Sequence, residues 1–397
     1  MIRELIDRNS RWCIPVFEPM KSRILLLLLV FCGVQMVTPQ SVAQKRAERL
    51  GVGMNLSYLD NWWLGTQEKH YSDFAKFEEA AKREKMFADI ARAGFKTVRL
   101  PICFSAWMEL KPPYNWDSEP GLEMADSFVK WALADGLNVI IDLHHSEFNN
   151  KMPDATTSER IVNLWFRIAA RYKNTDPEKV FFELRNEPHD VAADAWRRQA
   201  KEIIKAVREI APKHTLIAGF HDWNSRQAMI DSEPFDDPNI IYTFHYYDPF
   251  IFTHQGATWV GNAGMSDLRN VPFPLSDKKI DVPKTSKGSW IEANINRYKD
   301  DSNPEKMYAD LKAAKDWSIK YKVPIFLGEF GSFGKFAAPE DRCRHAKTVY
   351  QALGKLNIPN AWWEWDGGFN MFDKGTTRIS DCMRAAVDSY GSQRSER

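Results

Sequence analysis

Apolar, strand-like runs alternate with amphipathic segments from residue 52 to residue 392, and this alternation constrains the fold more than any other feature. Most of the runs are continuous in apolar residues, as expected for parallel strands that are covered on both faces. Eight strands alternating with helices predict a closed (β/α)₈ barrel, the TIM barrel, in the α/β class and as a single domain. A doubly wound sheet is the alternative, but the glycine-rich turn that usually follows its first strand is missing.

The predicted strands are Val52–Asn55, Thr97–Pro101, Asn138–His144, Val180–Glu187, Thr215–Phe220, Ile240–Tyr247, Pro324–Glu329 and Ala361–Trp365. Helices are predicted between them, among them Phe77–Phe87, Ala195–Ile210 and Pro304–Tyr321. Asp194 is placed to cap the second of these helices, and Ser302-Asn303-Pro304-Glu305 is a typical start for the third.

The connection from Asp248 to about Asn303 shows no clear helix or strand. A loop of this length in a compact domain is usually functional or disordered. It follows a strand and carries Trp259 and Trp290, so we expect it to form a wall of the active-site cleft.

Two of the predicted strands end at a glutamate. Glu187 precedes Pro188, which has no N–H and cannot extend a sheet ladder, so the strand must end there. Glu329 ends a second apolar run, in Gly328-Glu329-Phe330-Gly331. Active sites of such barrels gather at the carboxyl ends of the strands. Two acids at two strand ends therefore match the requirement of a hydrolase that works with two carboxylates.

Further polar and aromatic residues occupy the other strand ends. Each has an ordinary explanation when taken alone, because a lone histidine is more often a structural group and a lone acid is usually solvated. Eight strand ends would seldom collect the whole set by chance. The set comprises Arg99, His144, His145, Asn186, Trp223, Asn224, His245, Tyr247, and Trp363 or Trp365.

Short motifs run through these positions in order: Val98-Arg99-Leu100-Pro101, Asp142-Leu143-His144-His145, Asn186-Glu187-Pro188, His245-Tyr246-Tyr247, Gly328-Glu329-Phe330-Gly331 and Trp363-Glu364-Trp365. This set resembles the signature of glycoside hydrolase family 5, the cellulase-type family of clan A. The opening Gly51-Val52-Gly53-Met54-Asn55-Leu56 is also similar to that family's first strand, although Ser57 stands where glycine is common. The resemblance extends from about residue 50 to about residue 392.

The resemblance implies a separate role for each glutamate. Glu187 is similar to the family's acid/base and Glu329 to its nucleophile, which makes the reaction a double displacement with retention. The two carboxyls should then lie roughly 5–5.5 Å apart. Carboxylates at close range resist being ionised together, so one pKa should rise. We expect Arg99 and Tyr247 to hold Glu329 ionised, and His245 to contact Glu187.

Other residues are expected to contact or support the sugar. Asn186 could hydrogen-bond the substrate 2-hydroxyl, and His144 would contact the same subsite. Trp363 is favoured for the floor on which the sugar stacks, because it aligns better with the family's strand end than Trp365. His145 and Trp223 are further candidates for substrate binding.

Three more glutamates lie near these motifs and are poor candidates for the catalytic pair. They are Glu147, Glu183 and Glu364. Glu183 lies earlier in its strand and could be a structural ion-pair partner inside the barrel. Glu364 alternates with two tryptophans, so we expect it to face away from the one that lines the site.

The resemblance implies a secreted, endo-acting β-1,4-glucanase that needs no metal or cofactor. The same mechanism on β-mannan, xyloglucan or β-1,3-glucan is the alternative, because specificity rests on loop contacts to one or two hydroxyls. A barrel that binds carbohydrate without cleaving it is a remote alternative. No cysteine and histidine cluster has zinc spacing.

The expected partner is a polysaccharide or oligosaccharide. The net charge of +1 provides no electrostatic footprint for nucleic acid. We expect a monomer without stable membrane association once its signal is removed.

Residues 1–43 are predicted to be an N-terminal extension and secretory signal, and residues 44–397 the catalytic domain. Lys21-Ser22-Arg23 precedes an apolar run over 24–34, and Ser41-Val42-Ala43 is a small-x-small cleavage site. The apolar run is short for a membrane span. The start codon can be Met1 or Met20. The protein is expected to be secreted or periplasmic.

Export would permit disulfide bonds. Cleavage after Ala43 would leave Cys103, Cys343 and Cys382. The last two fall in the final two helical segments, which are neighbours in a barrel, so a bridge between them is a hypothesis.

Overall fold

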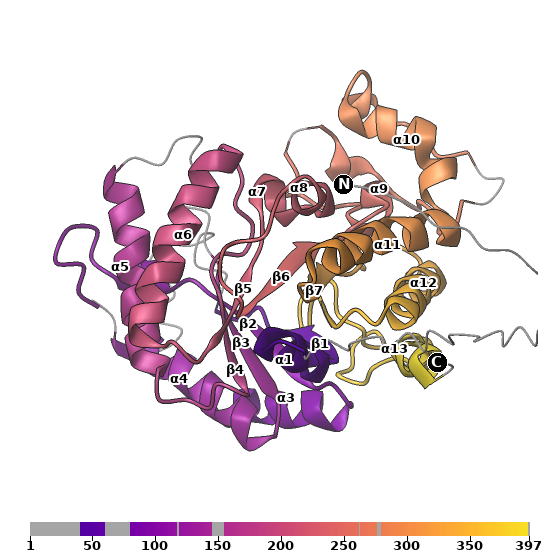
Figure 1. Ribbon diagram of the computed structural model, residues 1–397. Helices are drawn as coiled ribbons and strands as arrows, with labels where there is room; N and C mark the ends of the chain where they lie inside the picture. The colour runs from indigo at the N-terminus through magenta and orange to yellow at the C-terminus, as the bar shows by residue number, and fades with distance from the viewer. Residues whose placement is uncertain are drawn as a thin grey trace, which may run out of the picture. The chain divides into compact units, whose positions relative to one another are not determined.

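In the computed structural model, parallel strands close into a barrel in which each strand pairs with its neighbours in chain order (Figure 1). The structure describes residues 40–59, 80–116, 119–144, 155–261, 263–275 and 279–395. This architecture confirms the predicted (β/α)₈ barrel. The strands are β1 (Val52–Asn55), β2 (Thr97–Ile102), β3 (Asn138–Leu143), β4 (Val180–Glu183), β5 (Thr215–Ala218), β6 (Ile240–His245), β7 (Ile325–Phe330) and β8 (Asn360–Trp362).

β4 is shorter than predicted, since it ends at Glu183 and does not reach Glu187. The chain beyond it still follows β3, because the Asn186 N–H donates to the Leu143 carbonyl oxygen at 3.1 Å. Glu187 therefore lies on the segment that leaves the barrel rim, whereas Glu329 lies within β7.

Helices cover the outside of the barrel (Figure 1). They are α3 (Ala80–Arg92), η3 (Phe104–Trp107), α4 (Glu119–Ala134), α5 (Ala155–Tyr172), α6 (Ala193–Ile210), α7 (His221–Asn224), α8 (Arg226–Ile230), α11 (Pro304–Tyr321), α12 (Pro339–Leu356) and α13 (Asp381–Ser395). Asn303 caps α11, since its side chain accepts from the Lys306 N–H. The predicted cap at Asp194 is wrong, because this residue lies in the first turn of α6 and pairs with Arg198.

The connection from Asp248 to Asn303 is not free of regular structure, so that prediction was wrong. It contains α9 (Phe250–Thr253), two 3-10 turns, η4 (Met265–Asp267) and η5 (Lys284–Ser286), and α10 (Trp290–Asp301). The Gln255 side chain ties the segment together, since its amide nitrogen donates to the Val271 carbonyl and its oxygen accepts from the Val271 N–H. The buried apolar residues of this connection follow neither the period of a helix nor that of a strand. The sequence pattern therefore gave no sign of its short helices.

A helix near the start of the described chain, α1 (Val42–Leu50), packs against the barrel interior. Its residues Ala43, Ala47 and Leu50 are buried together with inward-facing residues of the strands. Those residues are Ile140, Phe181, Ile217, Ile241, Phe326 and Ala361. The predicted boundary between residues 43 and 44 falls inside this helix, and residues 1–39 lie outside the described ranges. N-terminal processing stays a prediction.

A disulfide joins Cys343 of α12 to Cys382 of α13, with the two Cα atoms 5.8 Å apart. The hypothesis of this bridge is thereby confirmed in the structure. Cys103 is buried and takes no part in this bridge, and its thiol donates to the Leu59 carbonyl oxygen. Within the described ranges, no helix has the length and apolar content needed to cross a membrane.

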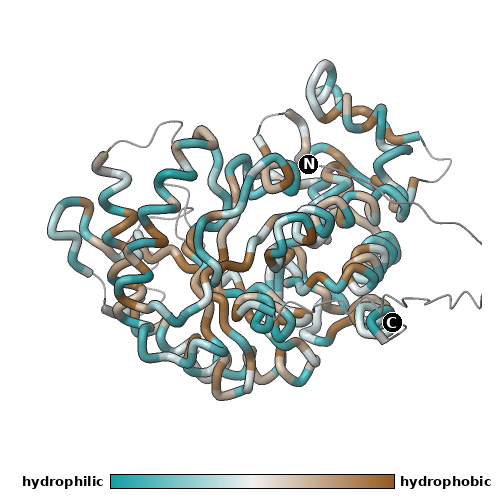
Figure 2. Tube along the Cα trace, in the orientation of Figure 1, coloured by the Kyte–Doolittle hydropathy of each residue, from teal (hydrophilic) through white to brown (hydrophobic). Residues whose placement is uncertain are grey.

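Hydrophobic residues concentrate on the central strands, and hydrophilic residues dominate the outer turns of the surrounding helices (Figure 2). The strands are buried along their whole length, apart from the first residue of β1. This burial on both faces explains why the strand sequences read as continuous apolar runs.

Candidate active site

The ends of β4, β6 and β7 bring two carboxylates and one imidazole together. One oxygen each of Glu187 and Glu329, and a ring nitrogen of His245, all lie within 4.8 Å of one another. Groups of these types can also ligate a divalent metal ion. The nearest oxygens of the two glutamates are therefore no more than 4.8 Å apart, which is closer to the roughly 5–5.5 Å of a nucleophile and acid/base pair than to the roughly 6.5–9.5 Å that leaves room for an attacking water.

Glu329 is surrounded by hydrogen-bond donors. Arg99 Nη1 donates to its Oε1 at 2.8 Å, and the Tyr247 hydroxyl donates to its Oε2 at 2.9 Å. The side chain of Glu329 is only 6% exposed. Burial raises the pKa of Tyr247 well above its ordinary value, so the phenol keeps the proton that it donates. The guanidinium and the phenol place two donors on the Glu329 carboxylate and fix its direction.

Arg99 is fully buried and connects several polar groups beneath the site. Its Nε and Nη2 donate to the two oxygens of Glu183 at 2.7 and 2.8 Å. Nη2 also donates to Asn186 Oδ1 at 2.8 Å and lies 3.0 Å from an oxygen of Asp142. Glu183 is thus an ion-pair partner inside the barrel, as expected. The planar fork of one guanidinium holds several carboxylates in place at once.

Glu187 has a different environment from Glu329. Its Oε1 lies 2.6 Å from His245 Nδ1, and its side chain is 22% exposed. Burial raises the pKa of Glu187 to about 7. This effect outweighs that of the nearby His144 and Arg99, whose charges lower the pKa. Burial also lowers the pKa of His245 to about 4, so the imidazole is neutral at neutral pH. A carboxyl that keeps its proton near neutrality can act as a general acid.

Asn186, His144 and Trp363 form one wall beside the glutamates. The Asn186 amide nitrogen lies 3.4 Å from His144 Nε2, and Asp142 holds the other ring nitrogen of His144 at 2.8 Å. The His144 ring stacks on Trp363, with ring centroids 5.6 Å apart and planes within 15°. The fixed imidazole and indole leave a flat, rigid surface next to the two carboxyls.

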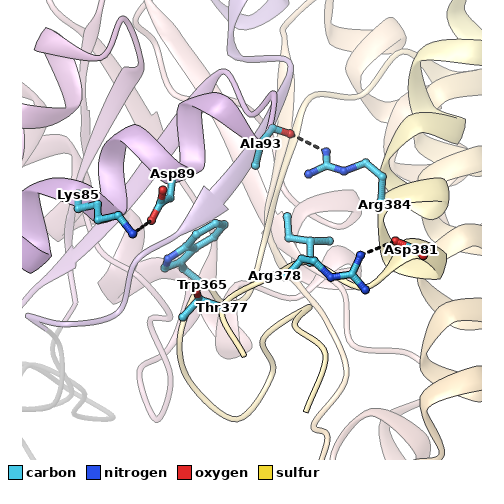
Figure 3. Close-up of a pocket in the computed structure, with 9 residues that line it drawn as sticks. Lys85, Asp89, Ala93, Trp365, Thr377, Arg378, Asp381 and Arg384 are labelled. Carbon is cyan, nitrogen blue, oxygen red and sulfur yellow. Dashed lines mark hydrogen bonds and ion pairs between the residues drawn. The ribbon is translucent and has the colours of Figure 1, made fainter. Parts of the chain in front are cut away.

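The two tryptophans after β8 have different surroundings. Trp363 meets His144, whereas Trp365 is 5% exposed and packs edge-on against Phe95 and Phe372. Trp365 lines a hollow formed with side chains of α3 and α13, among them Lys85, Asp89 and Arg384 (Figure 3). Trp363 is therefore the tryptophan that can reach a sugar at the glutamates.

Trp223 contacts the two residues that follow Glu187. Its indole is 53% exposed and stacks on the His189 ring, with centroids 3.5 Å apart and planes within 3°. The Trp223 N–H donates to the Pro188 carbonyl, and His189 Nδ1 donates to the Glu187 carbonyl. Asp222, Trp223 and Asn224 all have left-handed φ angles, between 52° and 59°. An exposed ring held in an unfavourable backbone conformation is typical of a functional position. His145 lies outside the described residues.

Several residues of the site were not singled out from the sequence. Asn55 accepts from Arg99 Nη1 at 3.0 Å and donates to the Gly328 carbonyl. Asp142 orients His144, although it was noted only as part of a motif. Glu364 is buried, and its Oε2 accepts a hydrogen bond from the Ser57 hydroxyl beyond β1. β8 ends at Trp362, and the alternation of a strand does not continue through Glu364.

Comparison with known proteins places the chain among cellulases. The family model described as cellulase, glycosyl hydrolase family 5, matches residues 61–368. Endoglucanase C of Acetivibrio thermocellus is 30% identical over 323 residues, which cover 79% of the chain and 90% of that relative. Endoglucanase 3 of Fibrobacter succinogenes is 29% identical over 369 residues, or 87% of the chain. The match spans only 54% of that longer relative.

Solved structures show the same relationship. Endoglucanase Cel5A of Thermotoga maritima is 28% identical, with a TM-score of 0.68 over 86% of the chain and 98% of that protein. The same Thermotoga enzyme has been solved in complex with mannotriose and in complex with cellobiose.

Proposed function

Because the chain belongs to glycoside hydrolase family 5 and is a glycosyl hydrolase, we propose that it cleaves β-1,4-glucan with retention of the anomeric configuration. The observation that carries this proposal is the pair of glutamates. One oxygen of each lies within 4.8 Å of the other, and each carboxyl has different partners. Relatives named endoglucanases support a β-glucan substrate.

In the first step, a Glu329 oxygen attacks the anomeric carbon while the glycosidic bond breaks. The carboxyl proton of Glu187 passes to the leaving oxygen, so the leaving sugar departs as a neutral alcohol. Arg99 and Tyr247 hold Glu329 as the anion and aim it. The product of this step is a glycosyl ester on Glu329.

In the second step, the carboxylate of Glu187 takes a proton from water, and the water oxygen attacks the anomeric carbon. The ester bond to Glu329 breaks and returns the carboxylate. The neutral His245 imidazole, 2.6 Å from Glu187, allows this carboxyl to gain and lose its proton without an added positive charge nearby.

Aromatic residues on both sides of the glutamates can hold the sugars. Trp363 and His144 form the wall for the sugar that becomes attached to Glu329. Trp223 lies beside the acid Glu187, so its exposed ring is placed for the departing sugar. Stacking on flat rings is suited to the apolar faces of a β-linked glucan.

The direct test replaces each glutamate by glutamine. Glu329→Gln should lower activity on soluble β-glucan by at least about 10⁴-fold, because the nucleophile is lost. Glu187→Gln should lower it by about 10²–10⁴-fold, and less on aryl glycosides whose leaving groups need little acid assistance. The control is Glu202→Gln, at an exposed position of α6. Turnover near that of the control in either site variant would refute the mechanism.

β-Mannan is the second candidate substrate, because the similar Thermotoga enzyme was solved with mannotriose as well as with cellobiose. Activity on a panel of purified polysaccharides distinguishes β-glucan from β-mannan as the substrate. The lengths of the products, read by chromatography, distinguish endo from exo action.

We also propose that the protein is exported. The basic and apolar segment over 21–34 and the Cys343–Cys382 bridge support an oxidising destination. Cleavage upstream of Ser41 would leave α1 whole, because the Ser41 side chain caps that helix. Expression of the full chain in a bacterial host, followed by N-terminal sequencing of the active protein, tests this. Full-length protein retained in the cytoplasm would contradict it.

A further inference from the structure

Glu364 is a buried carboxyl that the two-glutamate reaction does not use. It is 8% exposed. The Ser57 hydroxyl hydrogen-bonds to its Oε2, and the backbone N–H of Phe369 donates to the same carboxyl. The loop passes closely over it, since a Cβ added to Gly367 would lie 1.8 Å from Oε1. Glu364 is thus held between the segment after β1 and the loop over residues 366–369.

The backbone on either side fixes where Glu364 lies. The Trp363 N–H donates to the Phe330 carbonyl at the end of β7, and the Trp365 N–H donates to the Asn55 carbonyl at the end of β1. Glu364 therefore lies at the carboxyl end of the barrel, between β7 and β1. It directly follows Trp363, whose ring stacks on His144 in the wall beside the two glutamates, so this short segment reaches the site of the nucleophile.

This corner lies across the barrel from the acid. Glu187 follows β4, whereas β8 and β1 occupy the opposite part of the closed strand order. The leaving sugar must lie on the side of Glu187, which protonates it. The sugars that stay on the enzyme as the ester of Glu329 then extend toward the corner of Glu364. We refer to these as the donor-side sugars.

The chemistry of Glu364 suits a sugar hydroxyl. An ionised carboxylate has about four acceptor positions. Ser57 and the Phe369 N–H account for two of them. Burial raises the pKa of Glu364 to about 7. A hydroxyl of a bound sugar would give the carboxylate a further donor and so favour its ionised form.

We propose that Glu364, positioned by Ser57, accepts a hydrogen bond from a hydroxyl of a donor-side sugar and contributes to substrate specificity. This inference rests on the proposed function. The competing explanation is that Glu364 only anchors the loop over residues 366–369. An amide could anchor that loop equally well through its carbonyl oxygen, whereas it would lack the charge that strengthens a bond to a sugar hydroxyl.

The test uses Glu364→Gln and two aryl substrates with the same leaving group, 4-nitrophenyl β-cellobioside and 4-nitrophenyl β-glucoside. They fill two donor-side positions and one, respectively. We expect kcat/KM to fall by about 10–100-fold on the cellobioside, because a hydrogen bond to a charged group is lost. A fall on the cellobioside alone assigns the bond to the second sugar, and a fall on both assigns it to the first. Both results support the proposal.

Ser57→Gly supplies a second variant that leaves Glu364 in place. If Ser57 acts by positioning Glu364, Ser57→Gly should lower kcat/KM on the cellobioside less than Glu364→Gln does. The double variant should then have the same kcat/KM as Glu364→Gln. Glu202→Gln is the control again, and thermal unfolding is measured for every variant. Unchanged kcat/KM on both substrates, with or without a lower Tm, overturns the proposal in favour of a loop anchor.

Failure of this inference and failure of the proposed function are distinguishable. A wild-type protein that cleaves neither β-glucan nor the cellobioside would reject the proposed substrate. A wild-type protein that cleaves them while Glu364→Gln cleaves them equally well would reject only the role of Glu364.

Discussion

At the scale of single residues, two carboxyls of the same type acquire different properties from their neighbours. Glu329 receives bonds from a guanidinium and a phenol, whereas Glu187 faces a neutral imidazole and is partly buried. The pKa of Glu187 rises to about 7 through burial. The division between attacking anion and proton donor is thus a matter of environment, since the side chains are chemically identical.

The raised pKa of Glu187 predicts the alkaline side of the pH–activity profile. Glu187 must carry its proton in the first step, so kcat/KM on β-glucan should fall as the pH rises through about 7. The measurement is kcat/KM between about pH 5 and pH 9 on β-glucan. An aryl substrate with a good leaving group should show a weaker decline. The assignment fails if Glu187→Gln, assayed on that aryl substrate, keeps the same decline near pH 7.

At the scale of elements, the last two helices are joined covalently. Cys343 and Cys382 are 39 residues apart in sequence and lie on α12 and α13, which pack against each other. A cross-link of this kind restricts the unfolded chain more than the folded one. The position of the two cysteines on consecutive helical segments made the pairing foreseeable, because consecutive helices of a barrel are neighbours.

Removal of the bridge should lower the free energy of unfolding by about 2–4 kcal/mol. The variant carries Cys343→Ser and Cys382→Ser, and urea denaturation measures its stability. Reducing agent is the matched control. It should lower the free energy of unfolding of the wild type to nearly that of the variant, and it should leave the stability of the variant unchanged. Equal stability of the oxidised wild type and the variant would show that the bridge contributes nothing.

At the scale of the whole molecule, α1 supplies apolar side chains to a core shared by six strands. Ala43, Ala47 and Leu50 are buried with the inward-facing residues of β3 through β8. Arg46 adds a buried bond to Thr215 at 2.9 Å. Because the helix contacts strands from most of the barrel, its loss should weaken the domain as a unit.

Ala47→Asp tests the contribution of α1. Ala47 is 4% exposed, so an aspartate there would place an unpaired carboxylate among apolar side chains and lower the Tm markedly. Lys45→Asp is the matched control, because it introduces the same residue at an exposed position of the same helix. Similar melting temperatures for both variants would mean that α1 does not stabilise the barrel.

The order of the eight strands and the two glutamates could be read from the chain itself, because both depend on local pattern. Continuous apolar runs identify strands covered on both faces, and Pro188 marks a point that the sheet cannot pass, although β4 already ends four residues before Glu187. Other features depended on contacts between distant segments. These include the packing of α1, the contact of Arg99 with Glu183, and the contact of Glu364 with Ser57. Periodicity reports which face of an element is buried, and only the closed barrel decides which residues meet there.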